Sequence, residues 1–432
     1  MRVLVLGAYG LIGLAIARSL HAAGHEVIGV GRSIEQGLRL FPGVRWLAAD
    51  IARLQHADQW KPFLNGVDVV VNSAGALQDS ARDDLSAIHH TSIEALISAC
   101  KDSTVTRVVQ ISAPGASTES SNEFMRSKAR GDAAVRAGGV EWVILRPGLV
   151  IAPNAYGGSA LIRMMAAFPL VSPLALADSR IQTVAISDLC AFVRDAVEGR
   201  LGTGTDIDLV EVESHSLREV VEHFRRWLGV PQPLVSIALP RWTLAPVAFI
   251  ADVFGQLGWR SPLRSNALLA LQTNIVGDAS RARQLRGSDL LSLEQSLDAM
   301  PATLQERWFA RLYLLLPLMI ATLAIFWLLS GVIGLTNLDH AAALLPADLI
   351  SKETGNALVV LGAVIDILLG VAILVRPFAR KACVGMVVVS FGYLVAGSLL
   401  TPTLWSDPLG PFIKVLPSII LALVTLALLE ER

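Results

Sequence analysis

The chain has 432 residues, of which 53% are hydrophobic and only 17% are charged, below the share of about 25% that is usual in soluble proteins. The formal net charge of −1 argues against a dedicated nucleic-acid-binding protein, because such proteins have a basic excess. The three cysteines, Cys100, Cys190 and Cys383, lie far apart, which excludes a disulfide scaffold and fits a reducing compartment.

Short β-rich runs alternate with helical stretches through residues 1–150, a pattern typical of βαβ units. The expected strands are Arg2–Leu6, Glu26–Val30, Val44–Ala48, Val67–Asn72, Arg107–Ser112 and Trp142–Arg146. The expected helices begin near Leu11, Gln55, Ile88 and Ser127. The sequence therefore predicts an α/β fold with a doubly wound parallel sheet.

The first expected strand leads directly into a glycine-rich segment with GxxGxxG spacing. Glycines there permit a tight turn, let the backbone approach a pyrophosphate and let the next helix pack closely on the strand. We predict a dinucleotide-binding loop formed by Gly7, Tyr9, Gly10, Leu11, Ile12 and Gly13. The alternative is a tight turn without a ligand. A signal peptide is a further alternative, against which the regular glycines argue.

The second expected strand ends at Gly31 and Arg32, where an NAD site commonly has an acidic residue that binds the ribose. An arginine can instead pair with a 2′-phosphate and stack on the adenine, so Arg32 favours NADP(H) over NAD(H). The alternative is that Arg32 is solvated and Glu35 binds the ribose.

These motifs resemble the short-chain dehydrogenase/reductase superfamily, in its extended or atypical branch with epimerase/dehydratase-like members. The resemblance covers roughly residues 1–230 and implies a Rossmann domain. It implies that Asp50 and Ile51 contact the adenine, that Ala74 and Gly75 lie beneath the cofactor, and that Ser112 is catalytic. Further similar segments are Asn72–Gly75, Arg146–Gly148 and Ile181–Leu189.

The chemistry of this superfamily depends on a Tyr-x-x-x-Lys pair on one face of a helix. Here Lys128 matches the lysine, but Phe124 stands where the tyrosine should be. The resemblance therefore implies that Lys128 is a catalytic and cofactor-binding residue. A phenyl ring cannot move a proton, so the usual proton relay does not carry over.

Three alternatives follow from Phe124. Hydride could pass to a quinone-like acceptor that needs no tyrosine, or another group such as Tyr156 could supply the proton. The domain could also be a catalytically silent dinucleotide-binding scaffold or redox sensor. An epimerase is disfavoured because that chemistry also uses the missing tyrosine.

The apolar excess is concentrated near the C-terminus, in four runs of about the 20 residues needed to cross a bilayer. They are Leu312–Leu335, about Asn356–Val375, Ala382–Leu400 and about Leu409–Leu429. We predict an all-α, four-helix transmembrane domain; buried helices of a soluble core are the alternative. This C-terminal region resembles the DoxX-like membrane family in its number of spans and in the segments Phe326–Gly331 and Asp407–Gly410.

Basic residues predict the orientation of these helices. Arg307 and Arg311 precede the first span, and Arg376, Arg380 and Lys381 fill the second connection. The N-terminal domain and the C-terminus are therefore expected on the cytoplasmic side of the cell inner membrane.

Two charged side chains fall inside the predicted spans, Asp366 and Lys414. Ionisable groups are costly in lipid, so both are candidate functional residues, which could pair, or Lys414 could extend to the membrane surface. The histidines show no metal-binding spacing, so no metal site is predicted, and they are expected at the surface or at helix ends.

The predicted organisation is a dinucleotide-binding domain at 1–230, a linker at 231–300 with a membrane-surface helix near Trp242–Leu257, and the membrane domain at 301–432. The function predicted is a membrane-anchored oxidoreductase whose partners are a dinucleotide, the lipid bilayer and a quinone-like substrate, with no nucleic acid.

Overall fold

The computed structural model describes residues 1–76, 84–259, 261, 263–272, 274–346, 349–408 and 410–429. The chain divides into two compact units. The first unit comprises Met1–Asp252 and Ser261–Ala310, and the second comprises Val253–Arg260 and Arg311–Arg432.

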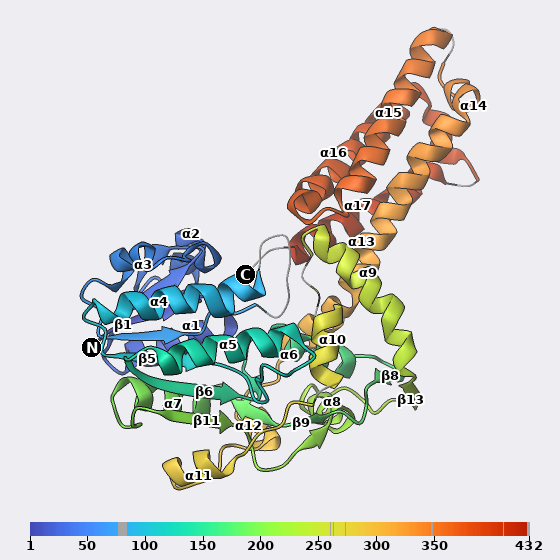
Figure 1. The fold of residues 1–432 in the computed structure, drawn as a ribbon. Coiled ribbons are helices and arrows are strands. Elements are labelled where there is room, and N and C mark those ends of the chain that lie inside the picture. The colour runs from blue at the N-terminus through green and yellow to red at the C-terminus, as the bar shows by residue number, and fades with distance from the viewer. Residues whose placement is uncertain are drawn as a thin grey trace. The chain divides into compact units, whose positions relative to one another are not determined.

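A parallel sheet of seven strands forms the centre of the first unit, in the order β11-β6-β5-β4-β1-β2-β3 (Figure 1). Its strands are β1 (Arg2–Leu6), β2 (Glu26–Gly31), β3 (Arg45–Ala48), β4 (Val69–Asn72), β5 (Arg107–Ile111), β6 (Glu141–Pro147) and β11 (Thr205–Leu209). The Rossmann-type sheet predicted from the sequence is confirmed. The strand order reverses between β1 and β4, and sheets of this kind bind ligands at the carboxyl ends of the strands beside that point.

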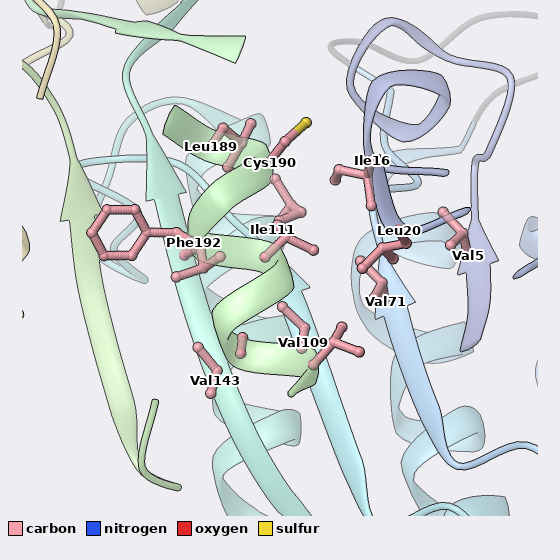
Figure 2. Close-up of a cluster of buried hydrophobic side chains, with 14 of the residues drawn as sticks. Val5, Ile16, Leu20, Val71, Val109, Ile111, Val143, Leu189, Cys190 and Phe192 are labelled. Carbon is pink, nitrogen blue, oxygen red and sulfur yellow. The ribbon is translucent and has the colours of Figure 1, made fainter. Parts of the chain in front are cut away.

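Helices cover both faces of the sheet, because successive strand residues point to opposite sides. On one face, α1 (Leu11–Ala22) and α7 (Ile186–Val197) pack on the strands, and Leu189 and Phe192 of α7 belong to the same apolar cluster as Val109 and Val143 (Figure 2). The other face is covered by α3 (Ala57–Leu64), α4 (Ser92–Lys101) and α5 (Glu123–Ala137). These two apolar layers fix the strand ends, where the candidate site lies.

Two helices differ from the sequence expectation. Helix α2 (Ile34–Leu40) was not predicted; the hydroxyl of Ser33 caps it by accepting a hydrogen bond from the amide of Gln36. Helix α5 begins at Glu123 rather than near Ser127, because the side chain of Asn122 accepts a hydrogen bond from the amide of Phe124 at 2.9 Å. Phe124 therefore lies in the first turn of α5.

A smaller lobe of the first unit has its own apolar core beside the sheet. Its helices are α6 (Gly158–Ala166), α8 (Leu217–Trp227) and α12 (Leu293–Asp298), and its strands are β7 (Leu149–Ile151), β8 (Val171–Ala175), β9 (Arg180–Ile181), β10 (Thr183–Ala185), β12 (His215–Ser216) and β13 (Val235–Leu239). The capping box predicted at Ser216 and Glu219 is present at the start of α8.

Part of the expected linker is held to the first unit by two buried acids. Asp188 accepts hydrogen bonds from Arg286 at 2.6 Å and from the amide of Leu291 at 2.8 Å. Glu211 accepts one from the amide of Leu293 at 2.7 Å. The helices in this part are α9 (Leu244–Gln256), α10 (Ser265–Gln272) and α11 (Ser280–Arg286). The three-part division by residue number stays a prediction.

The second unit is helical. Its helices are α13 (Leu304–Thr336, of which residues up to Ala310 belong to the first unit), α14 (Leu338–Ala342), α15 (Lys352–Ala372), α16 (Arg376–Leu400) and α17 (Pro411–Leu428). In the described chain, α13, α15, α16 and α17 are long and apolar enough to cross a membrane, as the sequence predicted. Leu409, the expected first residue of the fourth run, lies outside the described residues.

Candidate dinucleotide site

The glycine-rich loop forms a cradle between β1 and α1 that has no room for side chains. Gly7 has a positive φ of 71°, and a Cβ on it would lie 2.8 Å from the Cα of Ala74. A Cβ on Gly13 would lie 2.3 Å from the carbonyl oxygen of Gly7 and 2.6 Å from the Oγ of Ser73. The loop is therefore shaped by contacts that only glycine allows.

The start of α1 points backbone amides at this cradle. Gly10 is the residue before the helix, and no side chain caps it there. Leu11 and Ile12 occupy the first turn, whose N–H groups have no intrahelical acceptor. Unpaired amides and the positive end of the helix dipole favour an anion, so these residues fit the pyrophosphate of a dinucleotide.

Tyr9 connects the glycine loop to the end of β2. Its hydroxyl accepts a hydrogen bond from the amide of Arg32 at 2.9 Å, and its ring lies 6.2 Å from the ring of Trp46. A Cβ on Gly31 would lie 2.1 Å from the Cε1 of Tyr9. Gly31 is therefore required by the ring of Tyr9, and Arg32 is exposed at the carboxyl end of β2.

The other two expected cofactor segments follow β3 and β4. Asp50 is half-buried and lies 3.6 Å from Arg53, while Ile51 is buried in the core under the sheet. After β4, the amide of Ala74 donates a hydrogen bond to Asn72 at 3.1 Å, and Gly75 is exposed beside it. Both segments lie at carboxyl ends of strands: β4 is the neighbour of β1 in the sheet, and β3 is separated from β1 by β2.

Ser112 follows β5 and is buried. Its hydroxyl donates a hydrogen bond to the carboxylate of Asp132 at 2.7 Å. Asp132 is fully buried and also forms an ion pair with Arg146 at 3.2 Å. Burial raises the pKa of Asp132, although the Ser112 hydroxyl and the Arg146 guanidinium oppose that rise. Sequence reasoning missed Asp132, although its place four residues after Lys128 put both on one helix face.

Lys128 is buried on α5 with its Nζ donating a hydrogen bond to the carbonyl oxygen of Ile111 at 3.0 Å. Burial lowers its pKa to about 8, and the nearby carboxylate of Asp132 opposes that shift. A Cβ on Gly75 would lie 3.4 Å from the Nζ of Lys128. The structure thus brings the ammonium group to the turn after β4, and its cofactor-binding role stays a prediction.

His89 is the second residue that sequence reasoning missed, and the expectation of a surface or capping histidine is wrong for it. The side chain is buried, with Nε2 accepting a hydrogen bond from the amide of Ala76 at 3.2 Å. Its Nδ1 lies 2.9 Å from the hydroxyl of Ser127, and its ring meets Phe124 edge-on at 5.6 Å. Burial, with Lys128 nearby, holds the pKa of His89 well below its usual value. A neutral His89 therefore connects the turn after β4 to α5.

The remaining candidates lie elsewhere. Tyr156 is exposed in the loop before α6. In the second unit, Asp366 is buried and Lys414 is exposed, and the described residues show no ion pair between them. Asp366 forms hydrogen bonds with the hydroxyls of Ser330 and Tyr393. In the described part of the chain, no group of three or more His, Cys, Asp or Glu side chains is placed to hold a metal ion.

Two family models match the chain. Residues 7–163 match the NAD(P)H-binding family, and residues 324–423 match the DoxX-like family. The chain has no match among curated protein sequences. The glycine cradle falls within the first match, and α15, α16, the C-terminal part of α13 and most of α17 fall within the second.

Solved structures are similar in fold. The enzyme WbmG of Bordetella bronchiseptica in complex with NAD is 17% identical, with a TM-score of 0.52, over 71% of this chain and 93% of that chain. A variant of UDP-glucuronic acid 4-epimerase from Bacillus cereus, in complex with NAD, is 18% identical, with a TM-score of 0.51, over 72% of this chain and all (100%) of that chain. The protein thus combines an NAD(P)-binding Rossmann domain, whose structural neighbours are epimerase-like, with a DoxX-like domain.

Proposed function

We propose that the protein is a membrane-anchored oxidoreductase that binds NADP(H) and passes hydride to a lipophilic, quinone-like acceptor. The observation that supports it most is the buried Lys128 beside the glycine cradle, with Phe124 in the usual place of the tyrosine, in a chain with four apolar helices. A bound nicotinamide dinucleotide supplies the hydride. An acceptor protonated from water does not need the missing phenol.

Each group at the strand ends has a defined task in this proposal. The amides of Leu11 and Ile12 bind the pyrophosphate, and Gly7 and Gly13 let it approach the backbone. Lys128 holds the nicotinamide ribose. Its cationic form also stabilises negative charge that develops nearby.

Arg32 is the basis for proposing NADP(H) rather than NAD(H). It lies exposed after β2, where its guanidinium can pair with a 2′-phosphate. Glu35, the alternative ribose-binding residue, is exposed and lies 3.1 Å from Arg39, whose positive charge offsets its own. A 2′-phosphate therefore meets a basic side chain at this strand end.

A catalytically silent dinucleotide-binding scaffold or redox sensor is the second candidate function. The observation that favours it is the bond from Ser112 to Asp132, which occupies the hydroxyl hydrogen of the family-matched serine. Together with Phe124, it leaves two of the three usual catalytic groups unable to act in their usual way. Epimerase chemistry is not proposed for the same reasons.

The proposed orientation places the Rossmann domain and the C-terminus on the cytoplasmic side of the inner membrane. Its support is the basic residues Arg307, Arg311, Arg376, Arg380 and Lys381 beside the spans. Helix α9 is proposed as the membrane-surface helix, because Trp242 just before it and Phe249 and Ile250 within it are exposed apolar side chains.

The test is a fluorescence titration of the purified full chain with NADPH and with NADH, followed by NADPH oxidation with a short-chain quinone. Tight NADPH binding with quinone-dependent turnover supports the oxidoreductase, provided that Gly13→Ala weakens the binding and the turnover alike. Binding without turnover on any quinone supports the scaffold instead. Binding of neither dinucleotide contradicts both functions.

A further inference from the structure

Asp366 is enclosed where three helices of the second unit meet. Its Oδ2 accepts a hydrogen bond from the Oγ of Ser330 on α13 at 2.7 Å, and its Oδ1 lies 2.9 Å from the hydroxyl of Tyr393 on α16. Only 4% of Asp366 is exposed, although it lies on a helix apolar enough to cross a membrane. Three helices thus contribute one polar side chain each to a single cluster.

No cation neutralises this acid among the described residues. Residues 312–336 of α13 and 382–400 of α16 contain no acidic, basic or histidine side chain, and Asp366 is the only charged type in 354–372 of α15. Lys414 on α17 is exposed and forms no ion pair with it. An ionised carboxyl group in an apolar surrounding without a cation is far more costly than the neutral acid.

The number of hydrogen atoms available to the cluster also favours a protonated Asp366. The Tyr393 hydroxyl lies within hydrogen-bond distance of two acceptors, the Oδ1 of Asp366 at 2.9 Å and the carbonyl oxygen of Gly362 at 3.2 Å. It has only one hydrogen. If Asp366 is protonated, it donates to Tyr393, Tyr393 donates to Gly362, and Ser330 donates to Asp366. Each of these three oxygen–oxygen contacts is then a hydrogen bond with its own donated hydrogen atom.

Glycines hold this geometry in place. A Cβ on Gly362 would lie 3.0 Å from the Tyr393 hydroxyl, and a Cβ on Gly331, next to Ser330, would lie 2.5 Å from the carbonyl oxygen of Ala363. These glycines let α13 and Tyr393 approach α15 closely enough for hydroxyls to reach the carboxyl group. The cluster is therefore formed by the helix packing itself.

We propose that Ser330, Asp366 and Tyr393 form a proton-binding site within the membrane-spanning helices, in which Asp366 is the group that takes up and releases the proton. Tyr393 is 41% exposed and Ser330 is exposed, so two hydroxyls connect the buried acid to the bundle surface. A proton bound there can be exchanged with a molecule in the lipid phase. The inference does not depend on dinucleotide binding or on the proposed oxidoreductase activity.

The first test is infrared difference spectroscopy of the full chain in lipid vesicles at neutral pH. We expect a carbonyl stretching band of a protonated carboxyl group that disappears in Asp366→Asn. In Tyr393→Phe the band should remain and shift, because one hydrogen bond to the acid is lost. Ser390→Ala, which removes a buried hydroxyl three residues from Tyr393 on the same helix, is the matched control and should leave the band in place. Asp132→Asn identifies any band from the buried acid of the first unit.

The second test is chemical. A lipid-soluble carbodiimide reacts with protonated carboxyl groups, so peptide mass spectrometry should find the adduct on Asp366 and none in Asp366→Asn. Helical circular dichroism and gel filtration establish that each variant is folded. An infrared spectrum that Asp366→Asn leaves unchanged, or an unlabelled Asp366 in the wild-type chain, overturns the proposal. NADPH binding can fail without affecting either result.

Discussion

The hydroxyl of Ser112 donates a hydrogen bond of 2.7 Å to Asp132, which has no exposed surface. The side chain that matches a catalytic serine is therefore part of a buried polar network that also includes Arg146. Such networks hold secondary-structure elements in a fixed register, and removing one member leaves the others unsatisfied. Here the network joins the end of β5 to α5 and β6.

Asp132→Ala should destabilise the first unit by about 3 kcal/mol, because it leaves the buried Ser112 hydroxyl without its acceptor and removes one of the two carboxylates that pair with Arg146. Hydrogen–deuterium exchange of the full chain should show faster exchange in β5 and β6. Asp58→Ala, which removes an exposed, solvent-screened ion pair with Lys61, should leave exchange in β5 and β6 nearly unchanged. Equal protection in both variants would contradict a structural role for Asp132.

Gly13→Ala should reduce dinucleotide affinity by at least about tenfold, because a methyl group would collide with the carbonyl oxygen of Gly7 and distort the cradle. Gly202→Ala is the matched control, since a Cβ there meets nothing within 4 Å and its φ is not positive. Fluorescence titration with NADPH measures both. An unchanged affinity in Gly13→Ala would mean that the dinucleotide does not bind at this loop.

Much of this fold followed from sequence because the signals are local. Alternating apolar residues and the glycine spacing predicted the strands at the centre of the sheet, and long apolar runs predicted the four helices of the second unit. Helix α2 was missed because its short, mixed sequence depends on a single cap at Ser33. The start of α5 was misplaced because Asn122 acts through a side-chain hydrogen bond that periodicity does not reveal.

The site was predicted less completely, because the residues that the sequence did not reveal are defined by contacts between separate elements. His89 looked like a surface histidine, yet a π-helical turn at Ala87–Thr91 directs it toward the turn after β4. Asp366 was singled out from the sequence as an ionisable residue in a predicted span, but its partners, Ser330 and Tyr393, lie 36 and 27 positions away in sequence. No spacing rule connects residues on separate helices.

Arg32→Ala should weaken NADPH binding by about 10- to 100-fold and leave NADH binding nearly unchanged, because it removes one charge-assisted contact with the 2′-phosphate, worth about 1.5–3 kcal/mol. Arg39→Ala, which removes an exposed arginine of the nearby helix α2, serves as the control for loss of positive charge. Parallel titrations with both dinucleotides give the ratio directly. An equal loss for NADPH and NADH would contradict the assignment of Arg32 to the 2′-phosphate.

The pKa of Lys128, lowered to about 8 by burial, predicts a pH dependence of dinucleotide binding. Below this value the side chain is cationic and attracts the anionic ligand; above it the charge is lost. Affinity should therefore be constant below about pH 8 and fall by up to about tenfold per pH unit above it, as one linked proton requires. Lys128→Met should bind more weakly at neutral pH and show no such fall. A wild-type profile that is flat to about pH 10 would contradict the lowered pKa.

Phe124→Tyr tests whether the missing phenol is the only reason that this site does not reduce carbonyl compounds. The new hydroxyl would lie one helical turn from Lys128, on the same face, and could donate a proton to a carbonyl oxygen. NADPH-dependent reduction of a simple aldehyde should rise by about 100-fold or more, as positioned acid catalysis provides. Phe124→Leu, which adds no proton donor, should show no rise. If Phe124→Tyr binds NADPH normally but stays inactive, the bond between Ser112 and Asp132 is what keeps the site from such chemistry, and Ser112 must be released from that acid before a carbonyl substrate can use it.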